Sequence, residues 1–128
     1  MTSPLEAANA LIDAFGRHDT EAYFASFAAD ATFVFHTHVR PLRSRSDYEQ
    51  LWYAWEQDGF RVLGCESTDQ HVQMLTSDIA IFTHRVRTLA RTGDVEETAE
   101  ERETIVFQKR DGGRWLAVHE HLSPALEA

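Results

Sequence analysis

The stretch that decides the fold is residues 101–123, ERETIVFQKRDGGRWLAVHEHLS. Two runs rich in β-branched and aromatic residues flank the turn Asp111-Gly112-Gly113, a pattern that predicts an antiparallel hairpin. Because side chains alternate between the two faces of a strand, one face of the second run should carry Trp115, Ala117, His119, His121 and Ser123. Two imidazoles beside a tryptophan are costly to bury without partners, so we expect functional residues on this hairpin.

Upstream of the hairpin the sequence predicts further long strands. Residues 61–75 form a partly polar segment that should bend near Gly64 or Asp69. Residues 79–90 follow after a short polar turn, and a third strand ends near Arg110. This succession indicates an antiparallel meander.

The first third of the chain is predicted to be mainly helical. Ser3, Pro4 and Glu6 have the spacing of a capping box, and the helix that they start should end at Gly16.

A second short helix is expected over residues 20–27, a strand over 31–38, and a third helix from a capping box at Ser46 to Gly59. Helices followed by a meander predict an α+β fold, a bent antiparallel sheet with the N-terminal helices packed on its concave face. We expect a single domain over residues 1–128.

The amino-acid composition disfavours some classes of binding partner. The formal charge of −9 disfavours binding to nucleic acid or to an anionic membrane surface. The one cysteine, Cys65, cannot form an internal disulfide, which is typical of a reducing compartment. Neither a signal peptide nor a membrane span is predicted, so we expect a cytoplasmic protein.

Three motifs along the chain together resemble a known superfamily. They are the junction Phe27-Ala28-Ala29-Asp30-Ala31-Thr32, the pair Arg102-x-Thr104, and the ending Trp115-x3-His119-x-His121-x-Ser123. With the order of elements they are similar to the nuclear-transport-factor-2-like superfamily, in its SnoaL-like and ketosteroid-isomerase-like branch. That branch includes the association domain of calmodulin-dependent kinase II. The resemblance implies a cone-shaped fold with an apolar cavity, and commonly a homodimer formed through the outer face of the sheet.

The resemblance does not imply one reaction, because this fold hosts many. Ketosteroid isomerases need a tyrosine, a carboxylate base and a protonated aspartate. This chain has Leu11 near the expected tyrosine, Phe35 and His36 near the base, and Ile105 or Glu103 near the second acid. Steroid isomerisation by that residue set is therefore not expected.

The hairpin suggests a polar row inside the cavity. Pairing of Arg110 with Trp115 would bring together Thr104 with His121 and Arg102 with Ser123, on the face that carries His119. One interpretation is a site for proton transfer and for holding negative oxygen, since imidazole titrates near neutral pH and guanidinium binds carboxylates or enolates. The other is a buried polar network that fixes the register and meets a dimer partner.

The functional hypothesis assigns roles to particular residues. We expect three catalytic residues: His121 to exchange the proton, His36 as an alternate base, and Arg102 to stabilise developing oxygen charge. The expected ligand-binding residues are Tyr23, Trp52, Trp55, Thr104, His119 and Ser123. The spacing of His36 and His38 also raises the hypothesis of a metal site, but no third ligand is specified, so neither a metal nor another cofactor is expected.

The sequence therefore predicts a protein that binds a small, largely apolar molecule. The expected substrate is a polyketide- or steroid-like compound. The leading hypothesis is a cofactor-independent acid/base enzyme, an isomerase, cyclase, dehydratase or hydrolase. The alternative is a non-catalytic ligand-binding or association domain. Both share the expected homodimer.

Overall fold

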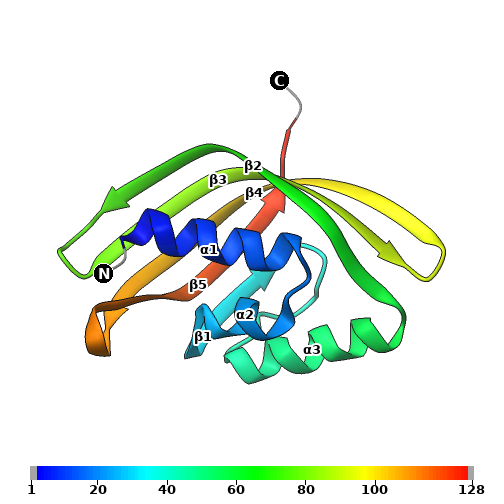
Figure 1. Cartoon of the computed structure of the whole chain (residues 1–128), viewed down its shortest axis with the longest axis horizontal. Coiled ribbons are helices and arrows are strands. Elements are labelled where there is room, and N and C mark those ends of the chain that lie inside the picture. Colours follow the sequence, from blue (N-terminus) through cyan, green and yellow to red (C-terminus); the bar gives the residue numbers. More distant parts are fainter. Residues whose placement is uncertain (1–2, 127–128) are drawn as a thin grey trace.

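One curved sheet of five strands, in the order β1-β5-β4-β3-β2, forms the wall of the molecule (Figure 1). The computed structural model describes residues 3–126. Its elements are α1 (Pro4–Gly16), α2 (Thr20–Ala25), β1 (Phe27–Phe35), α3 (Arg45–Gln57), β2 (Phe60–Met74), β3 (Ile79–Thr92), β4 (Val95–Arg110), the 3₁₀ turn η1 (Asp111–Gly113) and β5 (Arg114–Pro124).

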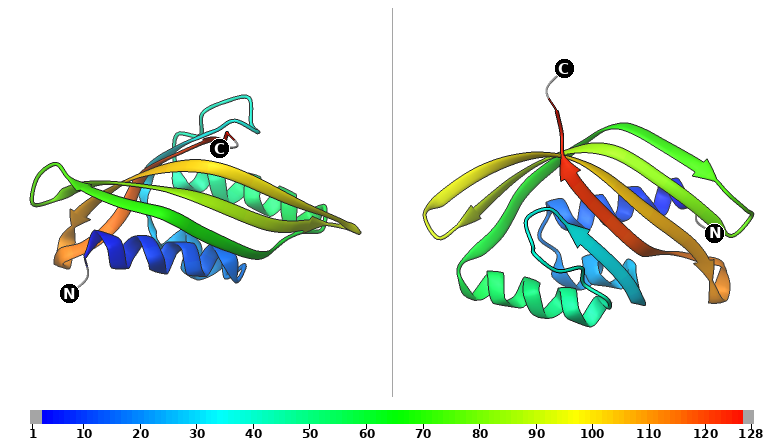
Figure 2. Two further views of the ribbon diagram at one scale, coloured as in Figure 1. Left: turned by 90° about the horizontal axis from the view of Figure 1, so that it is seen from above. Right: turned by 180° about the vertical axis from the view of Figure 1, so that it is seen from behind.

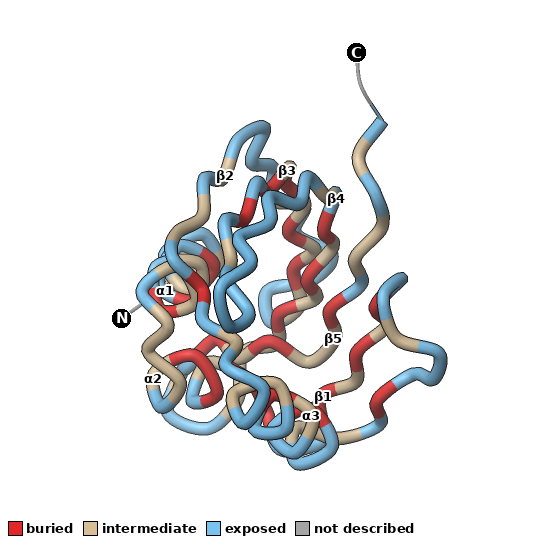
Figure 3. Tube along the Cα trace, turned by 90° about the vertical axis from the view of Figure 1, so that its right-hand side faces the viewer, coloured by how far each residue is buried: buried red, intermediate tan, exposed pale blue. Residues whose placement is uncertain are grey.

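The three helices lie under the arch of the long strands (Figures 1 and 2). This arrangement, helices on one face of a bent sheet, confirms the predicted α+β class. Buried positions alternate with more exposed ones along the strands that face the helices (Figure 3). None of the helices within residues 3–126 is long and apolar enough to cross a membrane.

The helix boundaries follow from their capping residues. The capping box of α1 is present, since Ser3 Oγ accepts from the Glu6 amide and the Glu6 carboxylate accepts from the Ser3 amide. The third helix begins earlier than predicted, because Ser44 rather than Ser46 is the N-cap and accepts from the Asp47 amide. Both serines precede an acidic residue by three positions, so the sequence pattern alone did not separate them.

Strand β1 differs from the prediction in its limits and in its direction. It begins at Phe27 and ends at Phe35, so His36 and His38 lie in the following turn region. It pairs with β5 in parallel, which makes the sheet mixed rather than fully antiparallel. A parallel pair requires a long connection, and most of the chain, from α3 to β4, lies between these two strands.

Strand β2 bends at both predicted places. Its register against β3 shifts between Val62 and Gly64 and again between Thr68 and His71. Asp69, inside the second shift, has a φ of 54°. Such irregularities increase the local bend of a strand, which curves the sheet around the helices.

A similar irregularity in β5 decides which side chains face inward. The hairpin closes on the pair Arg110–Arg114, one residue away from the expected Arg110–Trp115 pair. The register then shifts, because Phe107 pairs with Ala117 while the adjacent Val106 pairs with His119. Beyond this shift the pairs Thr104–His121 and Arg102–Ser123 are as predicted, but they no longer share a face with Trp115 and Ala117.

Candidate functional site

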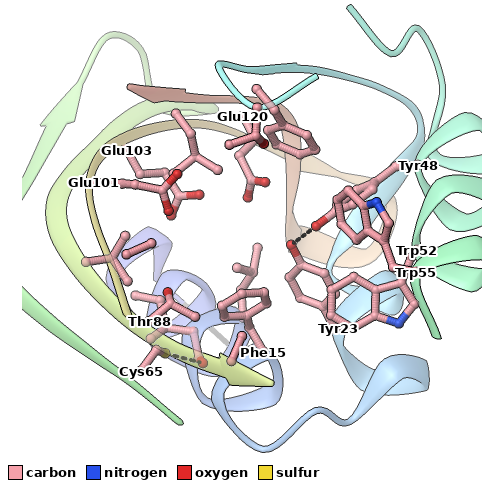
Figure 4. Close-up of a pocket in the computed structure, with 18 of the residues that line it drawn as sticks. Phe15, Tyr23, Tyr48, Trp52, Trp55, Cys65, Thr88, Glu101, Glu103 and Glu120 are labelled. Carbon is pink, nitrogen blue, oxygen red and sulfur yellow. Dashed lines mark hydrogen bonds between the residues drawn. The ribbon is translucent and has the colours of Figure 1, made fainter. Parts of the chain in front are cut away.

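A cavity of about 230 Å³ lies between the concave face of the sheet and the helices (Figure 4). Its size is below the roughly 300–1,000 Å³ of pockets that hold drug-sized ligands. The cavity is therefore suited to a small molecule.

The helices supply an aromatic wall. On α3, Tyr48, Trp52 and Trp55 recur at helical spacing, so they share the face turned to the sheet. The Trp52 ring lies 6.1 Å from Tyr48 and 6.3 Å from Trp55 between centroids, and its Nε1–H donates to Thr20 Oγ1 over 3.1 Å. The wall is completed by Phe15, Tyr23, Phe35 and Phe60.

Two tyrosine hydroxyls meet at this wall. Tyr23 and Tyr48 Oη atoms are 2.8 Å apart, and both side chains are buried. One hydroxyl proton forms the bond between them, which leaves the other proton free to donate into the cavity. Burial, and then the charge of Glu120, raise the pKa of both phenols well above the usual 10, so both remain donors at neutral pH.

The sheet supplies carboxylates in a row. Alternate residues of β4 line the cavity, and their exposure falls from the exposed Glu97 through the half-buried Glu101 to Glu103, which is 9% exposed. The cavity therefore opens toward the β3–β4 turn and closes near Glu103.

Glu103 is held by a histidine. His84 lies directly opposite it on β3, and His84 Nε2 is 2.6 Å from Glu103 Oε1. His84 Nδ1 is 2.6 Å from Ser67 Oγ on β2. In the protonated imidazole, and in the neutral tautomer whose Nδ1 accepts from Ser67, Nε2–H donates to Glu103. This chain presents Glu103 as an acceptor and fixes its position.

Glu120 is the most deeply buried acid of the site. It is 1% exposed, its carboxyl group points into the cavity in Figure 4, and its Oε2 has no hydrogen-bond partner within residues 3–126. Burial, and then the neighbouring carboxylate of Glu103, raise the pKa of Glu120 well above the usual 4.5. The protonated, neutral form of Glu120 is therefore favoured, beside the acceptor Glu103.

The structure divides the predicted site residues between the two faces of the sheet. Tyr23, Trp52 and Trp55 line the cavity. His36 is exposed at the rim of the cavity, where its Nε2 atom lies 2.6 Å from Glu101 Oε2.

The predicted polar row lies outside the cavity. Arg102, Thr104, His121 and Ser123 are not among the residues that line the cavity; with Arg85 they line a separate groove of about 520 Å³, which meets the cavity lining only at His84 and Glu103. His119 Nδ1 is 2.8 Å from Thr32 Oγ1 on β1. The expected position of this row in the cavity is wrong, because the register shift in β5 turns Glu120 inward where His119 and His121 were expected.

Sequence reasoning did not assign Tyr48 as a hydroxyl donor, His84 or Glu120 to the site, and it considered Glu103 only as a position near the second acid of a ketosteroid isomerase. The sequence could have indicated that Glu103 points inward, since it shares the period-two pattern of the buried Ile105 and Phe107. No sequence pattern indicated the inward direction of Glu120, because that direction depends on the register shift. Within the described residues, no group of three or more histidine, cysteine or acidic side chains is arranged to hold a metal ion.

A family model described as a SnoaL-like domain matches residues 5–127. The chain belongs to the SnoaL-like family. No curated protein matches this SnoaL-like chain.

Solved structures agree with this SnoaL-like assignment at the level of the fold. An NTF2-like protein of unknown function in nutrient uptake from Rhodospirillum rubrum has a TM-score of 0.83 at 20% identity, over 98% of this chain and 100% of that chain. A ketosteroid isomerase-like protein from Erwinia carotovora atroseptica has a TM-score of 0.78 at 17% identity, over 94% and 92%. A putative calcium/calmodulin-dependent protein kinase II association domain from Xanthomonas campestris has a TM-score of 0.71 at 19% identity, over 95% and 82%.

The SnoaL-like cavity thus combines a proton acceptor with two kinds of proton donor. Glu103 accepts, the neutral Glu120 donates, and the Tyr23–Tyr48 pair holds a further free hydroxyl proton. Glu103 and Glu120 lie side by side on the sheet, and the tyrosine pair faces them across an apolar space (Figure 4). An acceptor and donors arranged in this way can move a proton and stabilise negative oxygen.

Proposed function

We propose that the protein is a cofactor-independent acid/base enzyme that moves a proton on a small, largely apolar carbonyl compound. The observation that carries the proposal is the buried Glu120, whose raised pKa favours the protonated acid and whose Oε2 has no hydrogen-bond partner within the described residues, beside the His84-held Glu103 in an aromatic cavity. A protonated acid held beside a hydrogen-bond acceptor supplies the donor and the acceptor that acid/base catalysis needs.

The proposed chemistry begins with the Glu103 carboxylate taking a proton from the carbon next to the carbonyl. The electrons of the broken C–H bond form the enolate, whose oxygen accepts hydrogen bonds from Glu120 and from the free tyrosine hydroxyl. Return of the proton from Glu103 to another carbon of the conjugated system gives an isomer. The enzyme is thereby regenerated without a cofactor.

The cavity volume limits the size of the proposed substrate. About 230 Å³ favours a compound of one or two rings over a four-ring steroid. Trp52, Trp55 and Phe60 offer flat apolar surfaces that suit a planar ring. A small polyketide-like ring system meets both conditions.

The test is hydrogen–deuterium exchange at the α-carbon of 2-tetralone, followed by NMR in D₂O. The protein should accelerate exchange, and Glu103→Gln should reduce the acceleration about 10²-fold or more, since it removes the base. His121→Ala is the matched control, because His121 is exposed on the outer groove. Exchange that is equally fast in Glu103→Gln would reject this assignment.

The second candidate is association through the outer face of the sheet. The groove that contains Arg85, Arg102 and His121 supports it, as does the likeness in fold to the association domain. We propose that two copies pair through this face as a homodimer. Sedimentation equilibrium of wild type and Arg102→Glu tests the pairing. A monomeric wild type would contradict it, whereas a dimer weakened by the substitution agrees with it.

A further inference from the structure

We infer that the natural substrate of this cavity carries a protonated amine or another organic cation beside its reactive carbonyl. The inference rests on the proposed function and adds the charge class of the substrate. It comes from the charges that line the cavity, from a buried carboxyl oxygen without a hydrogen-bond partner at its closed end, and from the aromatic rings near its mouth.

The first observation is an excess of acidic groups. Four glutamates line the cavity, Glu97, Glu101, Glu103 and Glu120, and no lysine or arginine lines it among the described residues. Two of them have imidazole partners, because Glu101 pairs with His36 and Glu103 with His84, each at 2.6 Å. Even with both imidazoles protonated, the cavity retains an excess of negative charge, which repels anionic ligands and attracts cations.

The second observation is independent of the formal charges. The Glu120 carboxyl group is 1% exposed, points into the cavity, and has no hydrogen-bond partner for Oε2 within the described part of the chain (Figure 4). A buried polar atom without a partner is costly in the free protein. A bound ligand that reaches the closed end of the cavity would satisfy it.

The third observation concerns the aromatic rings. Trp55 lies 5.5 Å from Phe60, and 6.3 Å from each of Tyr48 and Trp52, between ring centroids. Trp55 and Phe60 are half-buried, in contrast to the fully buried Trp52, so this corner is reached from solvent. Aromatic faces carry negative potential and hold organic cations, and tryptophan holds them most strongly.

These features indicate where each part of the ligand would bind. The cationic nitrogen would lie between the rings around Trp55 and the carboxylates of Glu97 and Glu101. The carbonyl would lie at the closed end, near Glu120 and the tyrosine pair. A ligand of one or two rings is long enough to connect the two positions within a cavity of about 230 Å³.

Three probes of one shape test the inference by isothermal titration calorimetry. They are the cation benzyltrimethylammonium, its neutral isostere neopentylbenzene, and the anion phenylmethanesulfonate. We expect the cation to bind about tenfold more tightly than the neutral probe, and the anion to bind more weakly than both.

Matched variants locate the effect in the cavity. Glu101→Gln should reduce the preference for the cation about fivefold. Glu100→Gln makes the same change of charge on the same strand, at an exposed position that pairs with Arg85, and should retain the preference. Equal losses in the two variants would mean that the cation is attracted by net charge alone, which overturns the inference.

Two other results overturn it as well. One is equal affinity for the cation and the neutral probe, and the other is tightest binding of the anion. Exchange on 2-tetralone involves no charged group, so it tests the proposed function separately. A protein that catalyses this exchange and prefers no cation retains the proposed function and loses the inferred charge class.

Discussion

Glu103 lies directly opposite His84 in the β3–β4 ladder, and the His84 Nε2 atom is 2.6 Å from the carboxylate. The histidine side chain is fully buried and the glutamate side chain is 10% exposed. A hydrogen-bonded pair of this kind fixes the direction of the carboxylate inside an apolar space.

Removal of the histidine should therefore be costly. His84→Ala leaves the Glu103 carboxylate buried without its donor, and we expect the free energy of unfolding to fall by about 3–5 kcal/mol. Urea denaturation measures the loss. His36→Ala breaks the pair with Glu101 at the exposed rim, and should cost about 1 kcal/mol or less. Similar losses in both variants would contradict the assigned burial.

The pH dependence of stability should report the protonation of Glu120. Its pKa is raised by burial, then by the charge of Glu103 and the hydrogen bond with that side chain, and then by the charge of Glu101. Tyr23 and Tyr48 face it from the helices. Above the usual pKa of 4.5 the unfolded chain loses this proton and the folded protein keeps it. The contribution of Glu120 to stability is thus greatest below pH 4.5 and falls by about 1.4 kcal/mol per pH unit as the pH rises toward the folded-state pKa.

Glu120→Gln should remove this slope, because glutamine does not titrate. Urea denaturation between pH 5 and 8 (about three units) compares the variant with wild type, and Glu100→Gln serves as the control at an exposed site. We expect the glutamine variant to be more stable than wild type at the upper end of this range. Parallel profiles for wild type and Glu120→Gln would show that Glu120 is ionised in the folded protein.

The tyrosine pair should show strong energetic coupling. Tyr23→Phe or Tyr48→Phe alone leaves one buried hydroxyl without its partner, at a cost of about 1–3 kcal/mol. The double variant removes both hydroxyls and should cost less than the sum of the single losses. A double-mutant cycle by urea denaturation measures the difference. Strict additivity would mean that the hydroxyls do not interact.

The pKa of His119, on the outer face of the sheet, should lie below the usual 6.5. Burial lowers its pKa, the charge of His121 lowers it further, and the contact with Thr32 opposes both. His121→Ala should raise the pKa of His119 without reaching 6.5, since burial remains. NMR titration of the imidazole proton signals follows the change. Because the folded protein favours neutral His119, its contribution to stability is present above pH 6.5 and decreases as the pH falls.

Most of the fold could be predicted from local patterns. The capping box at Ser3 and the bends at Gly64 and Asp69 are present. Each of them depends on a few neighbouring residues whose preferences agree. The parallel pairing of β1 could not be predicted in this way, since it brings together strands at opposite ends of the chain.

The site was only partly predictable. Tyr23, Trp52 and Trp55 were expected at the cavity because the family resemblance implies an apolar cavity beside the helices, and all three line it. Charged residues are generally exposed, and Glu103 and Glu120 are exceptions that tertiary packing creates.

The register shift in β5 has a consequence for how this scaffold could acquire new activities. Regular pairing through Val118, without the shift, would place His119 and His121 opposite Ile105 and Glu103, exchanging the inward acid for the imidazoles that now face outward. Substitutions that remove or move this bulge would then be an efficient route to a different reaction. Libraries for directed evolution should therefore vary the residues around Val118 as well as the side chains of the cavity.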